Sequence, residues 1–142
     1  MKNALVATVA VDGTVFHFDK PYDYLIPKSF SDCVKIGCRV MVPFGAGNRK
    51  RQAMVLDIKQ TSEFDKLKPI VSLIDKTPIL SNEMLNLAEW MKEHLFCTYY
   101  DAFKPMLPAG INVRIVESYR INDNVDINSL EGYSQDEINV LT

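Results

Sequence analysis

The sequence predicts an α+β fold: a small, mostly antiparallel β-barrel-like domain with helices packed after the strands. Short apolar runs, several of them alternating with polar residues, fill the first half of the chain and predict strands. Glycine and proline separate these runs at short intervals, as between the strands of a small barrel or meander. After residue 81 the apolar spacing changes to steps of three and four, which indicates an amphipathic helix.

Five segments are expected to form the strands. The first, residues 5–11, is an apolar run closed by Asp12-Gly13 without a small-residue cleavage site, so we interpret it as a strand of a cytoplasmic protein and not as a signal peptide. The other four are bounded by proline, by glycine or by a turn, and they are residues 22–26, 38–42, 53–58 and 68–74.

Residues 44–51 join two of these strands. Their two glycines and one asparagine permit positive φ, which predicts a hairpin loop. Three cations, Arg49, Lys50 and Arg51, stand at its exit. They would contact phosphates if the partner is a polyanion, and otherwise they make a solubilising loop. A phosphate-binding P-loop is not indicated, because Lys50 stands where the second glycine of that motif is required.

A helix is expected over residues 82–96. Ser81 can cap its N-terminus, and Glu83 lies favourably in the first turn. One or two further helical turns are expected over 99–104, ended by Pro105.

Gly110 marks a predicted boundary. Residues 114–121 resemble a strand, and Ser134 to Glu137 form a capping box before a short helix that needs tertiary packing to be stable. We therefore expect one complete domain over residues 1–108 and, over 109–142, a linker with the beginning of a second domain.

Charge and chemistry-bearing residues exclude several functional classes. Residues 1–60 hold nine lysines and arginines against five aspartates, within a chain whose net charge is −2, which is a weak indication of a polyanionic partner. No G-x-S-x-G or H-E-x-x-H motif occurs, and Cys33, Cys38 and Cys97 fit neither a disulfide framework nor a zinc site. No apolar run approaches the ~20 residues of a membrane span. We expect no catalytic residue, metal ligand or cofactor in this chain, and no membrane partner.

The triplet Tyr22-Asp23-Tyr24 has two interpretations. On a strand the two tyrosines share one face and Asp23 points to the other. A tyrosine could stack on a nucleic-acid base, worth ~1–3 kcal/mol, and the carboxylate could accept a hydrogen bond from a sugar hydroxyl or a base amine. Alternatively the rings pack in the core and Asp23 is a solvated charge, which is the more common use of aromatic strand residues.

Several segments together resemble the N-terminal DNA-binding domain of the primosomal protein N′ family, the PriA replication-restart helicases. The segments are, in chain order, Y-D-Y-L-I-P at 22–27, G-C-R-V-M-V-P-F-G at 37–45, L-K-P-I at 67–70, P-I-L-S at 78–81, and Y-Y at 99–100 with L-P at 107–108. The resemblance spans residues 4–108, and its pieces occur in the order of the family.

The resemblance implies a domain that captures the 3′-terminal nucleotide of a nascent leading strand at a stalled or abandoned replication fork. By similarity the pocket residues are Tyr22, Asp23, Gly45 and Lys68, with phenylalanine common in the family where Tyr22 stands. The implied partners are single-stranded and forked DNA with a free 3′ end, together with primosome and single-strand-binding proteins that the parent protein would contact near the bacterial nucleoid.

Residues 111–142 fit the start of the winged-helix domain that follows in this family. The resemblance places the ATPase core and a zinc module in other parts of the parent, so ATP, Mg and Zn are expected only there, and this chain is not expected to be an enzyme. A second class stays open: a small β-barrel protein-interaction module whose basic rim binds an acidic peptide. That module needs only an exposed groove or strand edge, whereas DNA-end capture needs a confined pocket near Asp23, Gly45 and Lys68.

Overall fold

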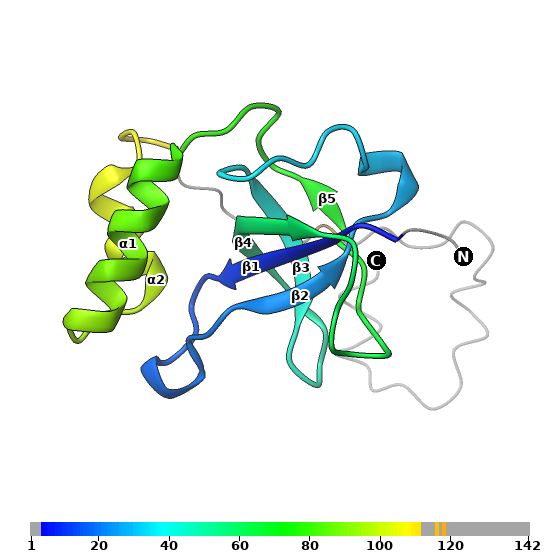
Figure 1. Ribbon diagram of the computed structural model, residues 1–142, viewed down its shortest axis with the longest axis horizontal. Helices are drawn as coiled ribbons and strands as arrows, with labels where there is room; N and C mark the ends of the chain where they lie inside the picture. The colour runs from blue at the N-terminus through cyan, green and yellow to red at the C-terminus, as the bar shows by residue number, and fades with distance from the viewer. Residues whose placement is uncertain (1–3, 112–115, 117, 119–142) are drawn as a thin grey trace, which may run out of the picture.

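The computed structural model of the chain describes residues 4–111, 116 and 118, and that part forms one five-stranded antiparallel sheet with two α-helices at one end (Figure 1). The strand order in the sheet is β2-β1-β4-β3-β5. The strands are β1 (Val6–Val11), β2 (Tyr22–Leu25), β3 (Arg39–Phe44), β4 (Arg49–Lys59) and β5 (Ser72–Leu73). The predicted α+β class with antiparallel strands is confirmed.

The sheet is not a closed barrel over these residues, because β2 and β5 remain its two edges. The stretch before β5 links them only locally. Leu25 donates its N–H to the Lys68 carbonyl at 2.9 Å, Ile70 donates to the Leu25 carbonyl at 3.0 Å, and an isolated parallel bridge pairs Leu25 with Pro69. The ladder between the two edge strands therefore stays open, although the stretch before β5 is hydrogen-bonded to the end of β2.

The predicted strand over residues 68–74 is mostly irregular, and only Ser72–Leu73 pairs as β5. The segment changes partner midway, from Leu25 of β2 to Met41 of β3, whose carbonyl accepts from the Val71 N–H at 2.8 Å. Pro69 also has no N–H to offer a ladder. Because the segment hydrogen-bonds first to β2 and then to β3, it does not form one continuous strand.

Residues 44–51 contain the predicted hairpin, which joins β3 to β4. Phe44 pairs with Arg49, so the turn is the four residues between them. Gly45 has φ +74° and Asn48 has φ +48°, which confirms the expected positive φ at these two turn positions. Arg49, Lys50 and Arg51 are the first three residues of β4 and follow the turn directly, at its exit as expected.

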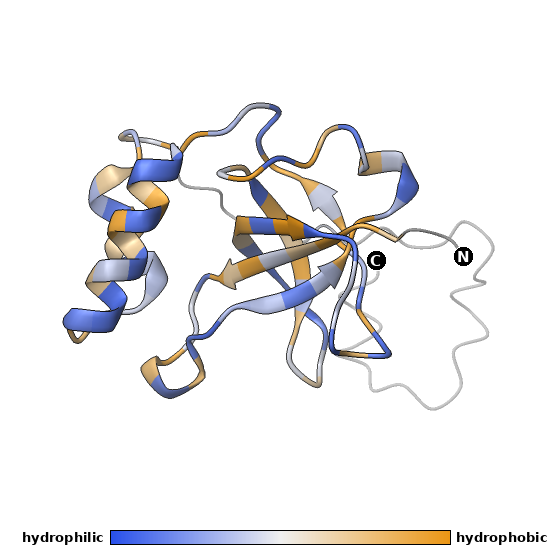
Figure 2. Cartoon of the chain, in the orientation of Figure 1, coloured by the Kyte–Doolittle hydropathy of each residue, from blue (hydrophilic) through white to orange (hydrophobic). Residues whose placement is uncertain are grey.

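The two faces of the sheet carry two hydrophobic cores. Because side chains alternate along a strand, neighbours in sequence point to opposite faces. The first core contains Ala7, Val9, Val11, Tyr24, Ile26, Val34, Val40, Val42, Ala53, Val55 and Ile70. The second core lies under the helices and contains Ala10, Met54, Leu80, Leu85, Ala88, Tyr99, Tyr100, Ala102 and Phe103. Figure 2 shows hydrophobic residues concentrated in β1, β3 and β4, whereas β2 is largely hydrophilic.

A bulge interrupts the pairing of β1 with β4. Thr8 pairs with Asp57, but the next residue, Val9, pairs with Val55, so Leu56 is an extra residue on β4. Beyond the bulge Ile58 packs against the first core, and Lys59 points to the opposite face.

The helices begin where the sequence predicted. Helix α1 (Asn82–His94) is capped by the Ser81 hydroxyl, which accepts from the Met84 N–H at 3.3 Å. It ends two residues before the predicted 96, because Thr98 and Asp101 form a capping box that starts α2 (Tyr99–Phe103). A 3-10 turn over Lys104–Met106 follows α2.

The predictions for residues 114–121, for the capping box at Ser134 and for the start of a winged helix concern residues outside the described part. The division at residue 108 stays a prediction. Among the helices that the structure describes, none is long and apolar enough to cross a membrane.

Candidate nucleic-acid interface

A pocket of about 640 Å³ lies where three segments meet on one side of the sheet. These segments are the start of β2 with the residues before it, the β3–β4 hairpin and the loop after β4, and in Figure 1 they project on the same side of the molecule. The residues that line it are 20–24, 44–45, 64 and 66–68. All four residues that the family resemblance proposed, Tyr22, Asp23, Gly45 and Lys68, are among them.

Tyr22 presents a half-buried ring to this pocket. The ring lies edge-on to Phe44, with centroids 5.2 Å apart and an interplanar angle of 82°. Its hydroxyl donates to the Phe18 carbonyl at 2.7 Å. Burial, and next the charge of Asp19, raises the pKa of this phenol above its ordinary value, so Tyr22 is neutral at physiological pH. The ring is fixed in position and only partly covered.

Tyr24 follows the packing interpretation. Its side chain belongs to the first core, and its hydroxyl donates to the Pro43 carbonyl at 2.8 Å. Burial, together with nearby Tyr22, raises the pKa of Tyr24 to about 12. Of the two tyrosines, Tyr22 is therefore the one with ring surface to offer a ligand.

Asp23 points to the other face of β2, as the strand alternation predicted. Its Oδ1 accepts from the Thr8 hydroxyl at 2.8 Å. Its Oδ2 accepts from the Ser62 hydroxyl at 2.7 Å and lies 2.8 Å from the Lys59 ammonium. The side chain is only 7% exposed, so it is not the solvated charge that the packing interpretation supposed.

The partners of Asp23 also set its ionisation. Burial by itself would raise the pKa of the carboxyl, but hydrogen bonds from Lys59, Ser62 and Thr8 and the charge of Lys59 bring it below its ordinary value. Asp23 is therefore a carboxylate at neutral pH.

Gly45 and Lys68 are joined directly. The Lys68 ammonium donates to the Gly45 carbonyl at 2.8 Å, which connects the hairpin to the stretch before β5. A Cβ added at Gly45 would meet nothing within 4 Å. The glycine is thus favoured by its backbone conformation, and the space beside it is open to a ligand.

The segment before β2 is anchored by a second buried aspartate. Asp19 accepts from the Thr14 hydroxyl at 2.9 Å and from the Tyr99 N–H at 2.8 Å, and it pairs with the Lys92 ammonium at 2.7 Å. These contacts hold the segment against both helices and so fix the adjacent Lys20 at the pocket edge.

The three cations of β4 do not act as one group. Arg51 donates to the carbonyls of Gly13 at 2.7 Å and Asp12 at 3.2 Å, and its guanidinium lies 5.6 Å from the Phe44 ring centroid. Arg49 and Lys50 are exposed beside the hairpin. The pocket lining itself does not include them.

Some lining residues escaped the sequence analysis, namely Phe44, Phe64, Lys66 and Leu67. Phe44 belongs to the V-P-F-G segment and could have been inferred from it. Phe64 and Lys66 lie in a polar loop without periodicity, so no local pattern pointed to them. Lys20, two residues before β2, also lines the pocket.

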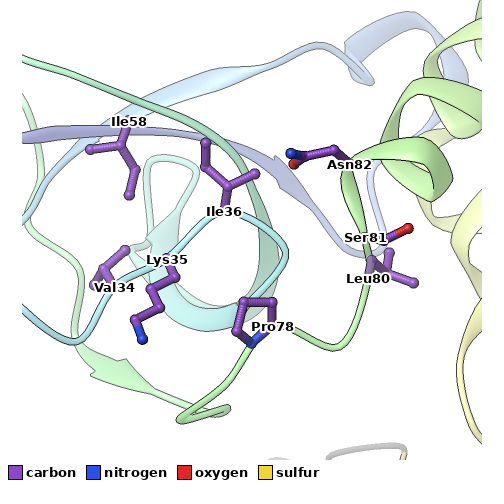
Figure 3. A pocket seen from close by; sticks show the side chains of 8 residues that line it. All are labelled: Val34, Lys35, Ile36, Ile58, Pro78, Leu80, Ser81 and Asn82. Carbon is purple, nitrogen blue, oxygen red and sulfur yellow. The ribbon is translucent and has the colours of Figure 1, made fainter.

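A second cavity of about 530 Å³ lies near the start of α1. Figure 3 shows Val34, Ile36 and Ile58 on one side of it and Leu80 and Asn82 on the other. Its lining is mainly aliphatic, with Lys35 as the one charged residue among those that line it, so it offers less to a polyanion than the first pocket. Within the described residues no three His, Cys, Asp or Glu side chains come together as metal ligands would.

Comparison with known proteins gives a consistent result. The family model described as the PriA 3′DNA-binding domain (3′BD) matches residues 8–108. The Replication restart protein PriA of Bacillus subtilis is 32% identical over 123 residues, which are 85% of this chain and 15% of that protein. The protein of the same name from Haemophilus influenzae is 33% identical over 72% of this chain and 13% of its own length. The one from Rickettsia conorii is 27% identical over 85% of this chain and 18% of its own length. The chain thus spans less than a fifth of these curated relatives.

Proposed function

This chain belongs to the PriA 3′DNA-binding domain family, and on that premise we propose that it binds the 3′ end of a DNA strand in the pocket formed by Tyr22, Asp23, Gly45 and Lys68. The observation that carries the proposal is the convergence of these four residues, from three separate segments, on one pocket. The same pocket also has Lys20 and Lys66 in its lining, which suits an anionic ligand.

Each residue has a chemical role in this proposal. The half-buried Tyr22 ring stacks on the terminal base, and base–aromatic stacking tolerates any sequence because every base has a π-face. Lys68 and Lys66 offset the charge of the nearest phosphates. The open space at Gly45 lets the ligand approach the backbone.

Asp23 supplies the selectivity for an end. A carboxylate repels a phosphate and is useful beside DNA only if it collects a specific donor, such as a free 3′-hydroxyl. Its lowered pKa keeps it charged and able to accept. A carboxylate has about four acceptor sites, and Thr8, Ser62 and Lys59 occupy three, so one remains for a hydroxyl.

At the level of the whole protein we propose a role in replication restart, with this domain reading the nascent leading strand at a stalled fork. Helicase activity, ATP with Mg and the zinc module would belong to other parts of a PriA protein. Contacts to primosome and single-strand-binding proteins would also be made by that larger protein.

A competition experiment tests the proposal. The 142-residue chain is titrated with two otherwise identical short oligonucleotides, one ending in a 3′-hydroxyl and one in a 3′-phosphate, and fluorescence anisotropy gives both affinities. We expect the hydroxyl end to bind about tenfold or more tightly, because a phosphate meets the Asp23 carboxylate. An acidic peptide serves as the control ligand. Equal affinity for the two ends, or stronger binding of the peptide, would overturn end capture and favour the protein-interaction module.

A further inference from the structure

Phe64 is an unusual member of the pocket lining. Its side chain is 64% exposed, whereas Tyr22 and Phe44 are half-buried and Tyr24 is buried. Phe64 belongs to neither hydrophobic core. A largely exposed phenylalanine at a pocket contributes little to folding, and its apolar ring is available to a ligand.

Phe64 lies between the two faces of β2. It lines the main pocket, on the Tyr22 side, and it also lines a smaller pocket of about 490 Å³ beside Lys59 and Ser62, on the side of the Asp23 carboxylate. Both pockets share Pro21, Asp23 and Phe64. The ring therefore stands at the border between the aromatic part of the site and its carboxylate.

Ser62 fixes the backbone that carries this ring. The Ser62 hydroxyl donates to Oδ2 of Asp23 at 2.7 Å and accepts from the Phe64 N–H at 3.2 Å. Such a hydroxyl bond to the N–H two residues ahead holds a local turn. The position of Phe64 is thus connected through one side chain to a buried carboxylate on β2.

We propose that Phe64 is a second stacking residue, which with Tyr22 encloses the terminal base between two aromatic rings, and that Asp23 positions it through Ser62. The inference rests on the proposed function and names two residues beyond the four that the family resemblance supplies. An exposed ring on a loop can adjust to a base, while the Ser62 bond limits how far it moves. Asp23 then has a positioning role in addition to any bond to the terminal hydroxyl.

The test uses 2-aminopurine, whose fluorescence falls when it stacks. The base is placed either at the 3′ terminus or internally in an otherwise identical oligonucleotide, and the 142-residue chain is added. We expect strong quenching of the terminal probe by the wild type. Phe64→Ala should reduce this quenching and weaken binding about tenfold, which corresponds to about 1.4 kcal/mol and lies within the range for one stacked base.

Phe96→Ala is the matched control, because Phe96 is 98% exposed and lies outside the pocket lining. It should leave affinity and quenching unchanged. For the positioning role, Ser62→Ala should reduce terminal quenching by a smaller factor, and Ser62→Thr, which keeps the hydroxyl, should restore it. The internal probe should respond weakly in every variant.

The outcomes separate the two proposals. One outcome is that the wild type prefers a 3′-hydroxyl end while the Phe64→Ala variant quenches the terminal probe and binds the oligonucleotide as strongly as the wild type does. In that case end capture stands, and the proposal that Phe64 stacks on the terminal base is wrong. If Phe64→Ala and Phe96→Ala lose affinity equally, the effect is not specific to the pocket, and the inference is also overturned. If the wild type shows no preference for the end, the proposed function fails and this inference fails with it.

Discussion

Thr8 on β1 and Asp23 on β2 face each other across the strand pair, and the Thr8 hydroxyl donates to the Asp23 carboxylate at 2.8 Å. This cross-strand bond attaches an edge strand, which carries half of the candidate site, to the centre of the sheet. Asp23 therefore contributes to the fold as well as to the proposed ligand contact, and experiments on it must measure both.

The first prediction concerns end discrimination. Asp23→Ala should reduce the preference for a 3′-hydroxyl over a 3′-phosphate end by about 1–3 kcal/mol, since it removes both the acceptor and the repulsion. Affinity for an internal single strand should change little. Competition between the two oligonucleotides measures the difference. Ser62→Ala is the comparison variant, because it disturbs the loop but leaves the carboxylate; an equal loss in both variants would contradict a direct role for Asp23.

The second prediction concerns acid stability. The folded state lowers the pKa of Asp23, so the unfolded chain binds more protons, and the carboxylate stabilises the fold above the ordinary value of about 4. At pH 7 the free energy of unfolding of the Asp23→Asn variant should be about 1–3 kcal/mol lower than that of the wild type, because the variant loses a charged acceptor. Urea denaturation at pH 7 and at several values below 4 checks this. The difference should shrink as the pH falls through the folded pKa, and a constant difference would be the contrary result.

The third prediction concerns the phosphates. Lys20 and Lys66 line the pocket. Replacing both with alanine should lower the slope of log affinity against log salt by about 1.4, at about 0.7 per phosphate contact on a single strand. The matched pair is Arg49→Ala with Lys50→Ala, beside the hairpin. If Arg49 and Lys50 contact phosphates, which is one of the two interpretations from the sequence, the slope falls for this pair too. An unchanged slope would show that these two cations only make the loop more soluble.

The fourth prediction separates Arg51 from the other cations. Its guanidinium donates to two carbonyls in the turn after β1. Arg51→Ala should lower the free energy of unfolding by about 1–2 kcal/mol through the lost bonds, while the salt dependence of DNA binding stays that of the wild type. Thermal or urea denaturation and a salt titration measure the two effects. A lower salt slope together with unaltered stability would show instead that Arg51 contacts a phosphate and does not stabilise the fold.

Local patterns predicted the elements whose determinants are local. The helix after Ser81 followed from a cap and an apolar spacing within a few residues, and the structure starts α1 there. The hairpin followed from Gly45 and Asn48, which have the positive φ that their residue types permit. These features depend on neighbours in the sequence, so the sequence alone sufficed.

The environment of Asp23 could not be predicted in this way. Its partners Lys59 and Ser62 are 36 and 39 residues away and come from the end of β4 and the loop beyond it. The division of the 68–74 segment between two partners also depends on where β2 and β3 lie in space. The family resemblance named four pocket residues, but Phe64 and Lys66 became visible only when the fold brought their loop to the pocket.

The extra residue at Leu56 has a consequence for insertions and deletions. On a regular strand Lys59 would share the face of Val55 and point into the first core, because side chains two apart lie on one side. The bulge reverses this parity, so that Lys59 reaches Asp23 and Ile58 takes the place in the core. A deletion of Leu56 alone would remove the extra residue and leave a regular ladder, in which Ile58 stays in the core and Lys59 still reaches Asp23. A deletion of Ile58 would instead move Lys59 into the place of Ile58, putting a lysine among valines and leaving the carboxylate without its cation. Deletion of the bulge residue Leu56 should therefore be tolerated far better than deletion of Ile58 in the same strand.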